Sequence, residues 1–151
     1  MNSIISILQK LFSKELDLLT TEINAYPTEE SLWGVDGNIK NPGGNLCLHL
    51  CGNLQHFVGN VLGKTDYVRN REAEFADKNV PKATLLQQIQ TTKESVKAAL
   101  AQLPAEKLNE EYPIQVFGEP MTTEYFLTHL LAHLSYHRGQ INYHRRLLGE
   151  R

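Results

Sequence analysis

The sequence has no apolar run long enough to cross a bilayer and no cluster of lysine or arginine. Its 15 basic and 17 acidic residues leave a formal net charge of -2, so there is no basic stripe to bind nucleic acid. The amphipathic N-terminal segment lacks a signal-peptide cleavage pattern. We therefore expect a cytoplasmic protein that binds neither nucleic acid nor a membrane.

Cysteine is also scarce, with two residues in the chain, Cys47 and Cys51. They are spaced i, i+4 in a segment that we predict to be helical. A disulfide there would cross-link one turn of a helix that is already ordered, and it suits a secreted scaffold better than this chain. We expect both cysteines to be reduced and buried.

Several catalytic motifs are absent from the sequence. The lack of E-x-x-H argues against a di-iron carboxylate bundle, and the lack of H-E-x-x-H removes the glutamate base of a metalloprotease. No G-x-S-x-G, Walker P-loop or G-x-G-x-x-G occurs either. The sequence therefore gives no motif-based reason to assign the protein to any of those classes.

What the sequence does contain is helical periodicity. Apolar residues recur at intervals of three and four in the segments 3–24, 42–62, 82–103 and 122–148. A chain of 151 residues fits one domain with a single core. We therefore predict an all-α, four-helix bundle forming one domain over residues 1–151, with connections long enough to allow a crossover.

The connections are predicted from their composition. Residues 28–31 are expected to form a short helical turn that docks Trp33 against the core. Residues 63–81 are expected to be a charged connection. Residues 109–120 alternate apolar and polar side chains, which predicts a short extended segment with a turn at Gly118.

Two of the predicted helix starts carry capping signals. Asn41-Pro42 predicts an N-cap followed by proline at the first helical position, and residues 84–87 resemble a capping box.

The first predicted helix has two glutamates, Glu15 and Glu22, inside its apolar arc. We expect their stems to pack while their heads reach water, and the alternative is that one points into a polar cavity.

The last helical segment, residues 122–148, contains four of the six histidines, His129, His133, His137 and His144. On a helical wheel His133, His137 and His144 share the arc of the apolar residues, and His129 lies at its edge. Imidazoles buried side by side cannot all be charged, and each needs a partner for its ring nitrogens. A divalent metal ion is a common partner for a pair spaced i, i+4, such as His133 and His137.

A third ligand must come from a facing helix, and His49 in the segment 42–62 is the best candidate. The wheel of that segment places both cysteines far from His49, which removes a zinc site of mixed cysteine and histidine ligands. Three neutral imidazoles hold Zn²⁺, Ni²⁺ or a similar ion and leave at least one coordination position open. An open site is typical of catalysis rather than of structure, because the ion lowers the pKa of a bound water or thiol.

The histidine segments also resemble a known family. The pattern H-L-S-Y-H-R-G-Q-I at residues 133–141, together with L-H-L at residues 48–50, resembles the DinB-like superfamily. Residues 48–57 and 69–75 resemble one subfamily more closely. The resemblance implies a four-helix bundle of up-down-down-up order, which is usually dimeric. It also implies a divalent metal, often Zn or Ni, held by the three histidines that match His49, His133 and His137.

The resemblance further suggests a reaction class. Characterised relatives include transferases and isomerases that use low-molecular-weight thiols, and proteins proposed to be metal-dependent hydrolases. We therefore expect a metal-dependent enzyme that activates a small thiol for transfer to an electrophilic substrate, or water for hydrolysis. The competing hypothesis is a non-enzymatic, metal-stabilised dimeric bundle that binds a ligand or partner. This chain carries additional histidines at positions 56, 129 and 144, and His56 is the main rival of His49.

Other residues receive expected roles from their positions. Gly139 is expected to permit close contact between helices, and Gln140 to be the partner of a ligand imidazole. Tyr136 and Tyr143 are expected to be packing aromatics. The arginines of the charged connection, Arg69 and Arg71, either pair locally with acidic neighbours or form the rim of a pocket for an anionic substrate. We expect structural or pocket-lining roles for His56, His129 and His144.

Overall fold

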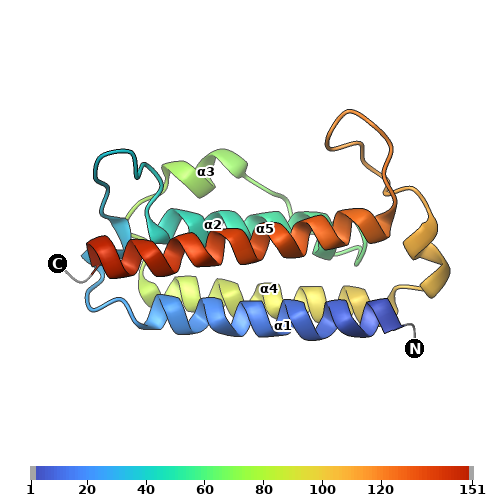
Figure 1. The fold of residues 1–151 in the computed structure, drawn as a ribbon, viewed down its shortest axis with the longest axis horizontal. Coiled ribbons are helices and arrows are strands. Elements are labelled where there is room, and N and C mark those ends of the chain that lie inside the picture. Colours follow the sequence, from blue (N-terminus) through green and yellow to red (C-terminus); the bar gives the residue numbers. More distant parts are fainter. Residues whose placement is uncertain (1–2, 150–151) are drawn as a thin grey trace.

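Four long helices dominate the computed structural model, which describes residues 3–149 (Figure 1). They are α1 (Ser3–Asn24), α2 (Gly43–Leu54), α4 (Lys82–Gln102) and α5 (Thr123–His144). Short π-helical turns continue α2 as η2 (Gln55–Asn60) and α5 as η4 (Arg145–Gly149). The predicted all-α bundle is therefore confirmed, and its four helices lie close to the predicted segments. None of the described helices combines the length and apolar character that a membrane span requires.

The helices run in the order up-down-down-up. In Figure 1, α1 and α5 run from right to left, whereas α2 and α4 run from left to right. Each of α1 and α2 packs against both α4 and α5. Because α2 and α4 run in the same direction, the chain between them must return along the whole length of the bundle. This connection is the crossover that the sequence allowed.

The crossover contains a short helix that the sequence did not predict. Helix α3 (Arg71–Ala76) lies in the predicted charged connection and packs on the outside of α2 (Figure 1). Its N-cap is Asn70, whose side-chain oxygen accepts a hydrogen bond from the backbone N–H of Ala73 at 3.1 Å. An Asn followed by glutamates at positions 72 and 74 is a recognisable helix start, so this signal was present in the sequence.

The predicted caps of α2 and α4 differ from the observed ones. Helix α2 begins at Gly43, one residue after the predicted position, with Pro42 as its N-cap. Helix α4 begins at Lys82, so the predicted capping box within it is wrong. The cap comes from a distant residue instead, since the carboxylate of Glu29 accepts from the backbone N–H of Lys82 at 3.0 and 3.3 Å. The short helix η1 (Glu30–Trp33) stands close to the predicted turn.

The two glutamates of α1 neither reach freely into water nor point into a polar cavity. Glu15 pairs with Arg138 of α5, and Glu22 accepts hydrogen bonds from Asn142 at 2.7 Å and from Arg145 at 3.1 Å. The glutamate side chains are 13% and 12% exposed. These contacts fasten the parallel helices α1 and α5 to each other along one edge of the core.

The loop before α5 is folded back on itself. After η3 (Ala105–Asn109), an isolated β-bridge joins Glu111 to Thr122, and Gly118 adopts a φ of +80° at the predicted turn. The rest of the segment 110–120 forms bends and turns rather than the predicted extended segment. The hydroxyl of Tyr112 donates to the backbone oxygen of Phe57 at 2.6 Å. The loop is thereby attached to η2 at one end of the bundle.

Candidate metal centre

Three histidine side chains from two helices converge in the bundle. His49 comes from α2, whereas His133 and His137 come from successive turns of α5. One ligand nitrogen of each ring lies within 4.8 Å of the others. The Nε2 atoms of His49 and His133 are 3.1 Å apart, and the ring centroids of His133 and His137 are 4.5 Å apart. The structure therefore brings together the three residues that the sequence singled out.

The donor set fits a divalent transition metal. Two imidazole nitrogens at about 2.0–2.1 Å from one zinc ion are about 2.8–3.4 Å apart in octahedral or tetrahedral coordination. The 3.1 Å between the Nε2 atoms of His49 and His133 falls in this range. His49 is buried, and His133 and His137 are half-buried, so the cluster has a closed side and an accessible side.

The outer nitrogen atoms of the three rings have different partners. The Nδ1 atom of His49 lies 3.0 Å from Oε1 of Glu74, and the Nδ1 atom of His137 lies 2.7 Å from Oε1 of Gln140. The Nδ1 atom of His133 is buried without a hydrogen-bond partner. The predicted contact of Gln140 with a candidate ligand is thus present, and a second outer partner, Glu74, was not foreseen.

Glu74 is a buried carboxylate that contacts one cationic side chain, Arg69, and one imidazole, His49. Its side chain is 6% exposed and accepts from Nε and Nη2 of Arg69, both at 2.9 Å, in addition to its contact with His49. Burial by itself raises the pKa of the Glu74 carboxyl, but the hydrogen bonds from His49 and Arg69 outweigh it and lower that pKa. Glu74 is therefore an ionised acceptor at neutral pH.

Two residues of helix α2 help to place Glu74: one leaves room for its carboxylate, and the other hydrogen-bonds its backbone. A Cβ atom on Gly52 would lie 2.0 Å from Oε2 of Glu74, so the absence of a side chain there makes room for it. The fully buried Asn45 donates through Nδ2 to the backbone oxygens of Glu74 at 2.9 Å and Asp77 at 2.8 Å. These contacts hold the C-terminal end of α3 against α2.

The two histidines of α5 that converge with His49 are neutral at neutral pH. Burial is the largest of the effects that lower the pKa of His133 to about 4, and the repulsion that a protonated His133 would meet from His137, His49 and other groups that carry positive charge when protonated acts in the same direction. Burial also lowers the pKa of His137 and outweighs the opposite effect of Gln140. Because a metal ion binds the deprotonated imidazole nitrogen, both rings are already in the form that binds.

Comparison with known families places the chain among proteins of this architecture. Residues 43–151 match the family model of the DinB family, so the match runs from the start of α2 to the C-terminus and includes all three converging histidines. The chain belongs to the DinB family. A search of curated proteins finds no significant match.

The remaining histidines of this DinB-family protein lie outside the converging group. The ring of His144 accepts at Nδ1 from the Tyr26 hydroxyl at 2.6 Å and donates from Nε2 to the backbone oxygen of Gly34 at 2.8 Å. It therefore joins α5 to the connection between α1 and α2. His129 lies between aromatic rings of the last loop and α5, and His56 lies against its neighbour Phe57, with ring centroids 4.7 Å apart.

Three expectations for α5 are corrected by the structure. A Cβ atom on Gly139 would meet no atom within 4 Å, so this glycine does not serve a close helix contact. Tyr136 and Tyr143 are 62% and 64% exposed and are not packing aromatics. The sequence could not show that these three residues lie away from close helix contacts, because a helical wheel does not show how much of the surface of α5 the neighbouring helices cover.

The two arginines of the crossover and the two cysteines make local or buried contacts. Arg69 pairs with Glu74, and the guanidinium of Arg71 lies 5.3 Å from the ring centroid of Phe75, so the local pairing considered for Arg69 is present. Cys47 and Cys51 are free and buried, as expected.

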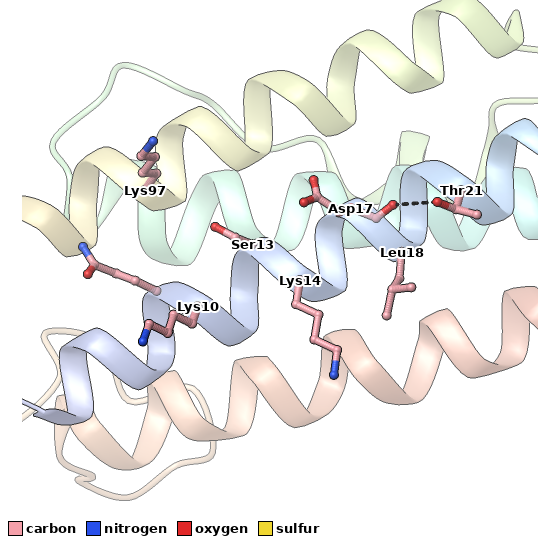
Figure 2. Close-up of a pocket in the computed structure, with 8 residues that line it drawn as sticks. Lys10, Ser13, Lys14, Asp17, Leu18, Thr21 and Lys97 are labelled. Carbon is pink, nitrogen blue, oxygen red and sulfur yellow. Dashed lines mark hydrogen bonds between the residues drawn. The ribbon is translucent and has the colours of Figure 1, made fainter.

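A hollow on the opposite pair of helices is unrelated to the histidines. It is formed by α1 and α4 and is lined in part by Lys10, Lys14 and Lys97 (Figure 2). Lys14 and Lys97 point in different directions in that view, so their charges do not converge on one point.

Proposed function

We propose that this DinB-family protein is a metal-dependent enzyme whose divalent ion, Zn²⁺ or Ni²⁺, is held by His49, His133 and His137. The observation that carries the proposal is the convergence of three imidazoles, one from α2 and two from α5, with ligand nitrogens within 4.8 Å of one another. Neutral nitrogen donors of this kind suit both ions.

The open side of the cluster supports an enzyme rather than a closed structural site. Three protein ligands leave part of the coordination sphere free, and His133 and His137 are only half-buried. A divalent ion at such a site lowers the pKa of a bound thiol or water and so supplies a nucleophile at neutral pH. We propose a low-molecular-weight thiol that is transferred to a small electrophile, with hydrolysis by water as the alternative.

The protein's own groups would position the reactants rather than act as a base. Glu74, the carboxylate that contacts the cluster, already accepts hydrogen bonds from Arg69 and His49 through both oxygens. It is therefore not free to take a proton from a substrate. The polypeptide's contribution is to keep the imidazoles neutral and oriented, and to leave one side of the cluster accessible.

We also propose a homodimer. Tyr125, Tyr136 and Tyr143 are between 62% and 64% exposed on α5, and their spacings of 11 and seven residues place them within about 20° on one face of the helix. Exposed apolar surface of this kind is typical of an interface. A second copy of the chain would cover the stripe.

The metal centre is tested by measuring bound metal in the purified protein and in His49→Ala, His133→Ala and His137→Ala. We expect one ion per chain in the wild type and strongly reduced Zn²⁺ and Ni²⁺ affinity in each variant. His56→Ala is the matched control, because it removes another histidine from the same stretch of chain, and it should retain the ion. Full occupancy in all three ligand variants would remove the proposal.

The enzyme is distinguished from a non-enzymatic binder by a panel of small thiols and electrophiles. We expect thiol consumption with the metal-loaded protein that is lost after chelation and restored by Zn²⁺ or Ni²⁺. A metal that raises only the unfolding temperature, with no turnover of any thiol or hydrolysable substrate, would favour the metal-stabilised bundle.

A further inference from the structure

We propose that Glu74 is the positioning residue of the metal centre, and that it fixes His49 with Nε2 directed toward the ion. Arg69 holds Glu74 in that role. The inference rests on the proposed function, since it concerns the ligand geometry of the same site. Glu74 would act through His49 and would touch neither the ion nor a substrate.

The hydrogen bonds determine which nitrogen of His49 carries the proton. The Nδ1 atom of His49 lies 3.0 Å from Oε1 of Glu74 and 3.5 Å from Nη2 of Arg69. The carboxylate is paired with the Arg69 guanidinium and only accepts, and its contact with the ring is the shorter of the two, so Nδ1 is the donor. The Nε2 atom of the neutral ring then holds the lone pair. That atom faces the Nε2 atom of His133 at 3.1 Å, where an ion shared by the two rings would be bound.

Both oxygens of Glu74 are occupied, which leaves the carboxylate one orientation. Oε2 accepts from Nε of Arg69 and Oε1 accepts from Nη2, each at 2.9 Å, in a two-point contact that fixes the plane of the carboxylate. Gly52 leaves room for Oε2, and Asn45 holds the backbone of the same residue. Groups from α2 and the crossover thus direct one carboxylate at one ring.

Among the three rings, His49 alone has a charged partner in these contacts. His137 has the neutral amide of Gln140, and His133 has no partner for Nδ1. An amide can present either its oxygen or its NH₂ group, so it fixes a tautomer less firmly than a carboxylate does. The orientation of His49 should therefore depend on its outer partner more than that of the other two rings.

The chain also offers a matched control, because it contains a similar ion pair that touches none of the three histidines. Glu22 pairs with Arg145 at 3.1 Å, and its side chain is 12% exposed. Glu22→Gln removes a mostly buried, arginine-paired carboxylate from α1, as Glu74→Gln does from α3. A loss common to both variants reports on stability, and a loss confined to Glu74→Gln reports on the metal centre.

The experiment measures Zn²⁺ affinity by competition with a chromophoric chelator in the wild type and in both variants. We expect Glu74→Gln to weaken Zn²⁺ binding by about 10- to 100-fold, the usual effect of removing an outer partner of a ligand histidine. Glu22→Gln should remain within about twofold of the wild type, because its carboxylate contacts no ligand. If Glu74→Gln does not fold, Arg69→Gln/Glu74→Gln replaces it, since that variant leaves no unpaired charge.

A second readout needs no metal. Long-range ¹H–¹⁵N spectra of the chelated protein should show His49 as the Nδ1–H tautomer in the wild type and as a mixture in Glu74→Gln. Unchanged Zn²⁺ affinity in Glu74→Gln, or an equal loss in Glu22→Gln, would overturn the inference. Should the wild type bind no metal, the proposed function fails, and the tautomer of His49 in the two proteins then decides whether Glu74 orients that ring.

Discussion

The space beside Gly52 provides a sharp test of how the crossover is attached to the bundle. In Gly52→Ala the new Cβ atom would stand 2.0 Å from Oε2 and 2.6 Å from Cδ of Glu74. Real atoms do not approach so closely, so the carboxylate must move. Its displacement breaks at least the 2.9 Å hydrogen bond from Nε of Arg69 to Oε2, in a position where Glu74 is 6% exposed.

Two opposing effects determine the sign of the stability change. Alanine in place of glycine inside a helix stabilises by about 0.5–1 kcal/mol. Loss of one hydrogen bond between charged groups costs about 1.5–3 kcal/mol. The second effect is larger, so Gly52→Ala should lower the free energy of unfolding by about 0.5–2.5 kcal/mol.

The matched control is Gly139→Ala, also inside a long helix, where a Cβ atom meets nothing within 4 Å. There only the gain of about 0.5–1 kcal/mol should remain. Urea unfolding in the presence of a chelator should therefore separate the two midpoints by roughly 1 M, given the usual dependence on denaturant. Equal stabilisation by both substitutions would refute the reasoning, because Glu74 would then have relocated at no cost.

Two further predictions concern α5. Burial lowers the pKa of His144, so the unfolded chain binds that proton more readily than the folded one, and the free energy of unfolding should fall as the pH drops through the ordinary histidine pKa of about 6.5. Urea titrations should show a smaller fall in His144→Gln, and an identical pH profile would contradict this. The second prediction concerns the proposed dimer: in sedimentation experiments, Tyr136→Lys should shift the protein from dimer toward monomer. Lys97→Ala, on α4, should leave the dimer intact. A wild-type protein that sediments as a monomer would rule the dimer out.

Some features of the site followed directly from local sequence. The spacing of His133 and His137 places both rings on one side of a helix whatever surrounds them, because four residues make about one helical turn. The apolar periodicity likewise predicted α1 and α4 to within one residue, since each helix forms its own hydrogen bonds and buries one face.

Other features depend on pairings between distant segments. The choice of His49 over His56 as the residue that approaches α5 depends on the packing register of α2, since both histidines lie on the same polar edge of the predicted segment 42–62. The partners of Glu15 and Glu22 lie more than 100 residues away on α5 and η4. No local pattern specifies such contacts.

Glu74 shows the difference most clearly. The sequence by itself determined a helical bundle with a histidine pair on one helix and a third histidine within reach, because those features arise from the repeat of the helix. Only the tertiary structure decided that the crossover folds back over α2 and lays α3 beside Gly52. That return brings a buried carboxylate to His49 from 25 residues further along the chain, through contacts that no helical repeat encodes.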